Sequence, residues 1–349
     1  MNKMPVNKAA WIDAKGTNFR VGDAPMPSPG PGEIVIRSRS VAINPLDWHM
    51  QDWGVFIKEW PSILGCDVAG EVYQVGAEVS RFKPGDRVTA HTINLVTGKP
   101  QDAAFAHYCV APAAKASILP DSISFESGAV LPLALEAGIC ALMLKTPGEA
   151  MPGVSTPALG IPHPKLTPTR LGKSIIVYGG SSSAGSMATQ LAVASGLDVV
   201  AVSSPQNFEL CRTSGASAVF DYRDPKLVEK VVEAATALSP PVGIFDAIST
   251  PDTYVHDLEI LSRLGGGHLA CTHPPPTENI AENVNAGMIF AVNDIAQPVW
   301  EEYVTPALEG GQLKCLPQPE IIGHGLEFIQ EGLNRSKAGV SGRKLVITL

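Results

Sequence analysis

The stretch Ser174–Gly196, SIIVYGGSSSAGSMATQLAVASG, decides the fold expected for this chain. It opens with SIIVY, an uncharged and β-branched run of the kind that parallel sheets bury on both faces. A glycine turn follows, and then small and apolar residues recur at helical spacing from Ser183 to Ser195. Strand, tight turn and helix in this order make up the first unit of a dinucleotide-binding fold.

The turn itself predicts a phosphate site, because free N–H groups and the positive dipole end of a helix attract a pyrophosphate. Measured against G-x-G-x-x-G, the chain has serine in place of the middle glycine, so the motif alone also fits an ordinary strand-to-helix turn. The residues predicted to line a cofactor here are Gly179, Gly180, Ser181, Ser182, Ser183, Ala184 and Gly185.

Regular alternation of strand and helix patterns downstream favours the nucleotide interpretation. Further strands are expected over residues 197–204, 217–222, 243–249, 267–273 and 287–292, with helices over 206–214, 225–238 and 251–264. Alternation at this spacing predicts an α/β fold with a parallel, doubly wound sheet.

The end of the second strand indicates which cofactor would bind. An acidic residue there holds the ribose 2′-hydroxyl of NAD, but Ser203, Ser204 and Asn207 include no acid. Hydroxyl and amide donors accept a 2′-phosphate, and Tyr222, after the third strand, is placed to cover the adenine or donate to the same phosphate. The sequence therefore predicts NADPH rather than NADH.

Composition sets outer bounds. With 349 residues the chain has room for two domains, and 45% hydrophobic with 17% charged residues describes a globular enzyme. A net charge of −8 argues against nucleic acid and anionic membranes as partners. We find no signal-peptide pattern at the N-terminus and no apolar run of about 18 residues, so a cytoplasmic location is expected. The six cysteines are scattered, as in reduced proteins.

The first 130 residues have short strand patterns separated by Pro/Gly turns, which predict an antiparallel barrel. Between the strands lie the phrases PGPGEIVI at Pro29, NPLDWH at Asn44, LGCDVAGEV at Leu64 and VGAEVSRFKPGDRV at Val75. With these phrases the chain resembles the medium-chain dehydrogenase/reductase superfamily over nearly its full length. NPLDW, GCDVAG, LPLAL, YGGSSSAG and SPQNF…FDYRD are similar to its zinc-free fungal branch of quinone-reductase-like proteins and trans-acting enoyl reductases.

The resemblance implies a GroES-like catalytic domain over residues 1–130, a Rossmann NADP-binding domain over 131–292 and a return to the catalytic domain over 293–349, with the active site in the cleft between domains. It also implies a monomer or homodimer acting on a small-molecule or carrier-protein-tethered enoyl substrate in fungal secondary metabolism.

The alternative of a zinc alcohol dehydrogenase is disfavoured by the residues at the metal positions of the zinc-dependent relatives. The first position falls in the Asn44–Asp47 phrase and the second is Cys66, so the usual Cys/His set is broken, although Cys66, Asp67 and His49 are possible ligand types. We predict no metal.

Without a metal, hydride delivery to an activated carbon–carbon double bond is favoured, with hydrogen-bond donors stabilising the enolate. By resemblance, Asn44, Asp47, Trp48 and His49 border the nicotinamide and the substrate. His49 is a candidate proton donor, with contact to the cofactor ribose as the favoured alternative. Asp47 is expected to be structural or to bind ribose.

Further cleft residues are carried over from the same resemblance. Glu136 stands where relatives place Ser or Thr, and a carboxylate beside an enolate is unfavourable unless protonated or turned away. This departure and His49 keep open a third hypothesis, a non-redox role such as cyclisation or a cofactor-binding scaffold. The substrate residues predicted are Leu133, Glu136, Ala137 and Phe290, and the remaining cofactor residues are Leu269, Ala270, Val340 and Ser341.

Overall fold

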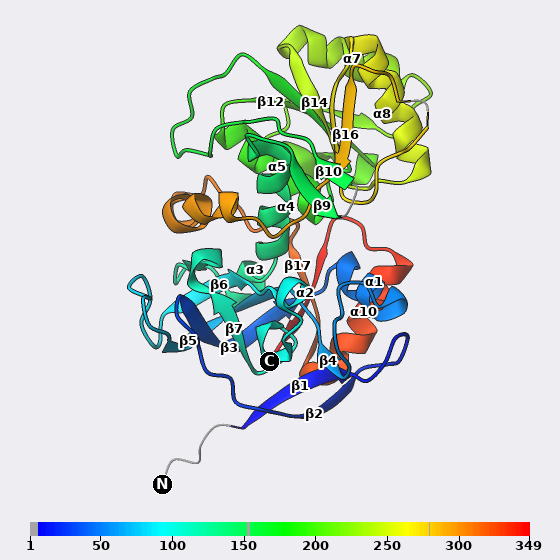
Figure 1. Cartoon of the computed structure of the whole chain (residues 1–349). Helices are drawn as coiled ribbons and strands as arrows, with labels where there is room; N and C mark the ends of the chain where they lie inside the picture. Colours follow the sequence, from blue (N-terminus) through cyan, green and yellow to red (C-terminus); the bar gives the residue numbers. More distant parts are fainter. Residues whose placement is uncertain (1–5, 152–153, 279) are drawn as a thin grey trace. The chain divides into compact units, whose positions relative to one another are not determined.

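The computed structural model describes residues 6–151, 154–278 and 280–349. The chain divides into a first unit of residues 1–132, 300–309 and 318–349 and a second unit of residues 133–299 and 310–317 (Figure 1). The return to the first unit thus begins at Trp300 rather than at residue 293, and a short stretch after it belongs to the second unit.

The second unit is built on a six-stranded sheet whose strands all run parallel. Its order is β13-β12-β11-β14-β15-β16, so the first strand in sequence lies beside the fourth and the sheet is doubly wound. The strands are β11 (Ser174–Tyr178), β12 (Asp198–Ser203), β13 (Ala218–Asp221), β14 (Pro241–Asp246), β15 (Gly267–Cys271) and β16 (Val284–Met288).

Helices cover both faces of this sheet, as the strand–helix alternation requires. Helices α7 (Leu227–Leu238) and α8 (Pro251–Leu264) lie side by side on one face (Figure 1), where Val231 and Leu261 pack into the core. The remaining helices of the unit are α4 (Pro132–Met143), α5 (Ser183–Ala194) and α6 (Phe208–Thr213).

Two details of this unit differ from the sequence prediction. The sixth strand ends at Met288, because the chain beyond Ile289 leaves the sheet and is bonded elsewhere. The second detail is a hairpin of β9 (Gly148–Met151) and β10 (Val154–Thr156), which was not among the expected strands; its connection, residues 152–153, lies outside the described residues.

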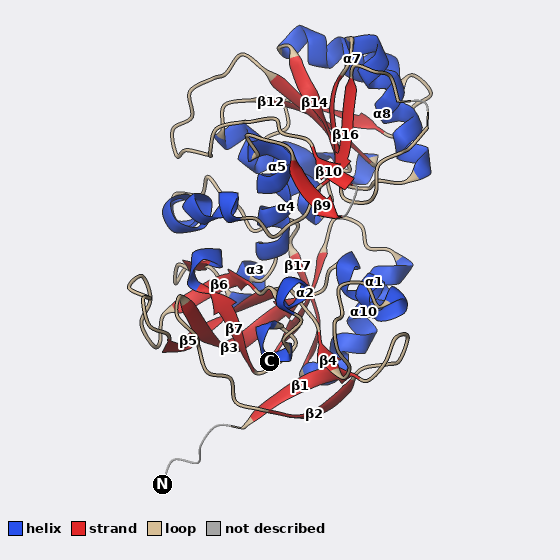
Figure 2. Cartoon of the chain, viewed as in Figure 1, coloured by secondary structure: helices blue, strands red, loops and turns tan. Residues whose placement is uncertain are grey.

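The first unit is dominated by strands, as Figure 2 shows. Its larger sheet has the order β17-β18-β3-β5-β6-β8, with β7 also paired to β3, and all pairs except β17 with β18 are antiparallel. The strands are β3 (Glu33–Ala42), β5 (Asp67–Val75), β6 (Arg87–His91), β7 (Tyr108–Pro112), β8 (Ala116–Ile118), β17 (Pro319–His324) and β18 (Lys344–Thr348).

A second, three-stranded sheet and short helices complete this unit. The sheet has the order β2-β1-β4, formed by β2 (Arg20–Ala24), β1 (Asn7–Ile12) and β4 (Ser62–Ile63). The helices are α1 (Pro45–Trp53), α2 (Asn94–Thr97), α3 (Phe125–Gly128), α9 (Val304–Glu309) and α10 (Ile329–Ala338).

One helical stretch, Phe125–Met143, passes a length and composition test for a membrane span. Because 78% of the most apolar 18 residues of this stretch are buried inside the protein, we assign the stretch to the core.

Candidate functional site

The turn after β11 has the geometry that a dinucleotide requires. Gly179 has a φ of 74°, in the left-handed region that glycine tolerates, and the chain then enters α5. Ser182 caps the helix, since its hydroxyl oxygen accepts a hydrogen bond from the N–H of Gly185 at 3.0 Å. A Cβ on Gly185 would lie 2.2 Å from the carbonyl oxygen of Gly179, so only glycine allows turn and helix to come this close.

A cluster of hydroxyl and amide side chains lies beside the turn at the end of β12. The hydroxyl of Ser203 donates to the hydroxyl oxygen of Ser181 at 2.8 Å. The amide of Asn207 donates to Ser181 at 3.3 Å and to the hydroxyl of Ser204 at 3.1 Å. The structure thus brings together four of the residues predicted to bind cofactor, and we call these four the polar cluster.

Tyr222 lies at the same edge of the sheet, because its N–H donates to the carbonyl oxygen of Ser203 at 3.2 Å. Its ring is 44% exposed, and the guanidinium of Arg223 lies over that ring, 5.4 Å from the centroid. Arg223 also pairs with Asp221, with Nε 3.2 Å from the carboxylate. Both Tyr222 and Arg223 line a surface cavity of about 410 Å³. Arg223 was not among the residues predicted to bind the cofactor, although a cation directly after Tyr222 was a readable signal in the sequence.

A buried polar scaffold supports the loop between β14 and α8. The carboxylate of Asp246 accepts hydrogen bonds from the N–H groups of Ile248 and Ser249, at 2.8 and 2.9 Å, and from the hydroxyl of Thr253 at 2.5 Å. One turn further along α8 lies Asp257, which is fully buried. Burial, then the charge of Asp246 and a hydrogen bond to it, raises the pKa of Asp257 well above its ordinary value.

We expect Asp257 to make stability fall as pH rises. The native state keeps the proton on Asp257, while the unfolded chain loses it above the ordinary pKa of 3.8, so raising the pH favours unfolding. The substitution Asp257→Asn removes this effect, because an amide of nearly the same size has no proton to lose in this pH range. Thermal unfolding should show the variant melting at least about 3 °C above the natural protein at about pH 8, with the gain absent at about pH 4. An equal gain at both pH values would contradict this assignment.

The other predicted residues of the second unit have mixed placements. Leu269 and Ala270 lie inside β15, paired to β14 on one side and β16 on the other, and are buried. Leu133 is half-buried, Ala137 is buried and Phe290 is half-buried. Glu136 is fully buried, and its carboxylate accepts a hydrogen bond from the N–H of Asn293 at 3.4 Å.

In the first unit, the phrase NPLDWH forms the start of α1. The N–H of Asn44 donates to the carboxylate of Asp47 at 2.7 Å, which closes the first turn of the helix. Burial raises the pKa of Asp47 to about 7, and the hydrogen bond from Asn44 offsets this rise only in part. The carboxylate of Asp47 therefore serves the local structure of α1.

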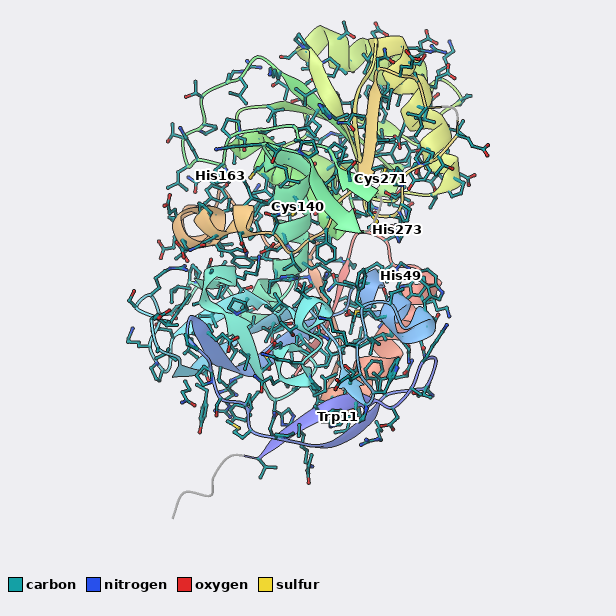
Figure 3. The ribbon with its side chains drawn as sticks, in the orientation of Figure 1. Trp11, His49, Cys140, His163, Cys271 and His273 are labelled. Carbon is teal, nitrogen blue, oxygen red and sulfur yellow. The ribbon has the colours of Figure 1, made fainter. Side chains whose placement is uncertain are left out.

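His49 lies on α1 (Figure 3), and its ring contacts two indole rings. Its ring stacks on that of Trp53, with centroids 4.4 Å apart and planes 12° apart, and meets the ring of Trp48 edge-on at 3.8 Å. Because the imidazole is 9% exposed, these contacts fix its orientation.

The side chain of Asn44 belongs to a network of three buried residues, which we call the buried triad. The amide of Asn44 donates to the carboxylate of Asp67 at 2.8 Å, and the ammonium of Lys344 lies 3.0 Å from that carboxylate. Lys344 also donates to the amide oxygen of Asn44. The triad joins the start of α1 to β5 and β18, from opposite ends of the sequence. From the sequence, Asp67 was considered only as a metal ligand, and Lys344 was not singled out. The predicted residues Val340 and Ser341 lie in the exposed turn before β18.

Comparisons with known proteins agree with this architecture. Two family profiles match, one described as an alcohol dehydrogenase GroES-like domain over residues 30–121 and one as a zinc-binding dehydrogenase over residues 184–291. The chain is 60% identical to "Dehydrogenase orsE" of Emericella nidulans, covering 99% of this chain and 100% of that one. It is 39% identical to "Trans-enoyl reductase himH" of Aspergillus japonicus, covering 99% and 98%.

Solved structures show the same fold at lower identity. A quinone oxidoreductase of Pseudomonas syringae superposes with a TM-score of 0.72 at 22% identity, covering 98% of this chain and all of that one. The CurK enoyl reductase gives 0.70 at 16% identity, covering 98% and 99%.

A GroES-like unit combined with a Rossmann unit defines an alcohol-dehydrogenase-like class of oxidoreductase. This chain belongs to the medium-chain dehydrogenase/reductase superfamily, among the fungal dehydrogenases and trans-enoyl reductases that it resembles. Members of this superfamily bind nicotinamide cofactors. The turn after β11, together with the polar cluster, fits such a cofactor.

The second profile's description implies a zinc ion, but the residues of the first unit do not fit one. Within the ranges 6–151, 154–278 and 280–349, no group of three or more His, Cys, Asp or Glu side chains is arranged to hold a metal. Burial raises the pKa of the Cys66 thiol well above its ordinary value, which disfavours the thiolate that binds zinc. The ammonium of Lys344 already binds the amide oxygen of Asn44 and the carboxylate of Asp67.

Proposed function

We propose that this chain is an NADPH-dependent reductase that needs no zinc and delivers hydride to an α,β-unsaturated carbonyl. The substrate is a small molecule or an acyl group tethered to a carrier protein, in fungal secondary metabolism, and the enzyme works in the cytoplasm as a monomer or homodimer. The relatives named trans-enoyl reductase support the reaction class, and one of them matches 99% of this chain.

The observations that carry the cofactor choice are the polar cluster and Arg223, which follows Tyr222 at the same edge of the sheet. Ser181, Ser203, Ser204 and Asn207 supply neutral donors to a 2′-phosphate, and the residues at the end of β12 include no carboxylate to repel it. Arg223 adds a cation on a half-exposed side chain, so a phosphate can compete with Asp221 for it.

The residues of each unit have separate tasks in this proposal. A bound NADPH supplies the hydride. The N–H groups at the start of α5 bind its pyrophosphate, and Gly180 and Gly185 permit the close approach. In the first unit, Asp47 and the buried triad fix the start of α1, and with it His49. We assign His49 to cofactor contact through its fixed ring. Water supplies the proton that completes the reduction.

The test is a coenzyme comparison with the purified chain and a panel of enals, quinones and enoyl thioesters. We expect oxidation of NADPH with at least one enoyl substrate, and kcat/KM at least about tenfold higher with NADPH than with NADH, the discrimination typical of one charge-assisted contact. Equal or better use of NADH would refute the cofactor choice. One tightly held zinc per chain would refute zinc independence.

The substitution Arg223→Ala sharpens this test. It should lower kcat/KM with NADPH about tenfold while changing the value with NADH less than about twofold. The matched control is Arg170→Ala, because Arg170 is also an exposed arginine paired to an aspartate, Asp198, at the opposite end of β12. If both variants lose the same factor with both coenzymes, Arg223 has no part in phosphate recognition.

A further inference from the structure

Glu136 is a carboxylate in the interior of the second unit. It lies in the middle of α4 and is fully buried, a placement that costs free energy unless hydrogen bonds compensate it. Its oxygen Oε2 accepts from the N–H of Asn293, the last residue before a short 3₁₀ turn over Asp294–Ala296. The carboxylate is thus turned toward the backbone of the chain that leaves β16.

That departing chain is held at two further points. Cys140, labelled in Figure 3, follows Glu136 by one turn of α4, and its thiol donates to the carbonyl oxygen of Phe290 at 3.1 Å. The hydroxyl of Thr156 on β10 donates to the carbonyl oxygen of Met288 at 2.6 Å. Three side chains therefore bond the backbone of Met288, Phe290 and Asn293 in succession. We call residues 288–293 the exit segment.

Helix α4 is itself fixed against the helix that carries the cofactor turn. A Cβ on Gly138 would lie 2.9 Å from the side chain of Leu191 and 3.3 Å from the backbone of Ala188, both on α5. The two helices are therefore in close contact at Gly138, and α4 offers a rigid base for Glu136 and Cys140. The positions of the dinucleotide turn and of the exit segment therefore both depend on the packing of α4 against α5.

We propose that Glu136 is a positioning residue for the exit segment and not a substrate contact. This inference rests on the proposed function, because the exit segment contains Phe290, which the resemblance assigns to the substrate. Residue 136 has a side chain long enough for its oxygen to reach the N–H of Asn293. The contact with the N–H of Asn293 needs a hydrogen-bond acceptor. The amide oxygen of glutamine should therefore replace the carboxylate, whereas the methyl group of alanine cannot.

The experiment compares Glu136→Gln and Glu136→Ala by amide hydrogen exchange of the full chain, with and without NADPH. Glu136→Ala should raise the exchange rate of amides in the exit segment at least about tenfold, since the bond to Asn293 is lost. Glu136→Gln should stay within about threefold of the natural protein. The control is Glu233→Ala, which removes an exposed glutamate from α7 and should change nothing in the exit segment.

Steady-state kinetics with the enoyl substrate give the second readout. We expect Glu136→Ala to raise KM for the enoyl substrate more than it lowers kcat, with rescue by Glu136→Gln. Unchanged exchange in the alanine variant, or a glutamine variant as impaired as alanine in both measurements, would overturn the proposal. If the natural protein reduces no enoyl substrate, the proposed function fails, but the exchange measurement still decides whether Glu136 holds the exit segment.

Discussion

The substitution Lys344→Met should strongly destabilise the first unit. It removes the ammonium that lies 3.0 Å from the carboxylate of Asp67, and both side chains are at most 4% exposed. Breaking a buried ion pair from one side leaves an uncompensated charge, which costs about 3–5 kcal/mol. In a domain of this size the loss corresponds to a fall in melting temperature on the order of 10 °C.

A double-variant cycle separates the charge from the packing. Lys344→Met combined with Asp67→Asn removes both charges, and the pair of substitutions should cost less than Lys344→Met alone. Thermal unfolding measures each variant, and calorimetry with NADPH checks that the cofactor turn in the second unit still binds. If the double variant melts below the single one, the ammonium does not compensate Asp67.

The substitution Gly185→Ala should strongly weaken cofactor binding. Its new Cβ would lie 2.2 Å from the carbonyl oxygen of Gly179 and 3.0 Å from the Cα of Gly180, so the turn and the start of α5 must separate. Separation moves the N–H groups that hold the pyrophosphate. We expect the Kd for NADPH to rise on the order of 100-fold by calorimetry, together with a lower melting temperature.

Gly196, just past the other end of α5, provides the matched control. A Cβ there would lie 2.0 Å from the carbonyl oxygen of Thr169, and its φ is 93°, so Gly196→Ala should destabilise the fold as well. Its Kd for NADPH should nevertheless stay within about threefold of the natural value, because the turn at Gly179 is untouched. Equal losses of affinity in the two variants would mean that general destabilisation explains both.

The sequence predicted the second unit well because its signals are local. A buried apolar run and a helical repeat each report their own segment, and the helix over Pro251–Leu264 was predicted to the residue. The sixth strand was misplaced by a few residues. GMIFAV has the composition of a strand, but Phe290 leaves the sheet because Cys140 bonds its carbonyl oxygen and Glu136 bonds the N–H of Asn293.

The residues that the sequence did not reveal are charged ones whose partners are distant. Lys344 and Asn44 are 300 positions apart, and a single lysine near a chain end usually lies in solvent. Glu136 was noticed as a departure from the family pattern, but only the structure shows that its oxygen is engaged by Asn293. Arg223 was overlooked although it directly follows Tyr222, whose N–H donates to the carbonyl oxygen of Ser203.

The buried triad also bears on how the protein is made. One member, Lys344, is synthesised after residue 317, at which the second unit is complete. During translation the nascent second unit can fold while Asp67 still lacks its cation, and β3 still lacks β18 as a neighbour. The first unit, although synthesised first, therefore completes its fold last, and a premature stop before codon 344 would release a chain whose exposed strand edge invites aggregation.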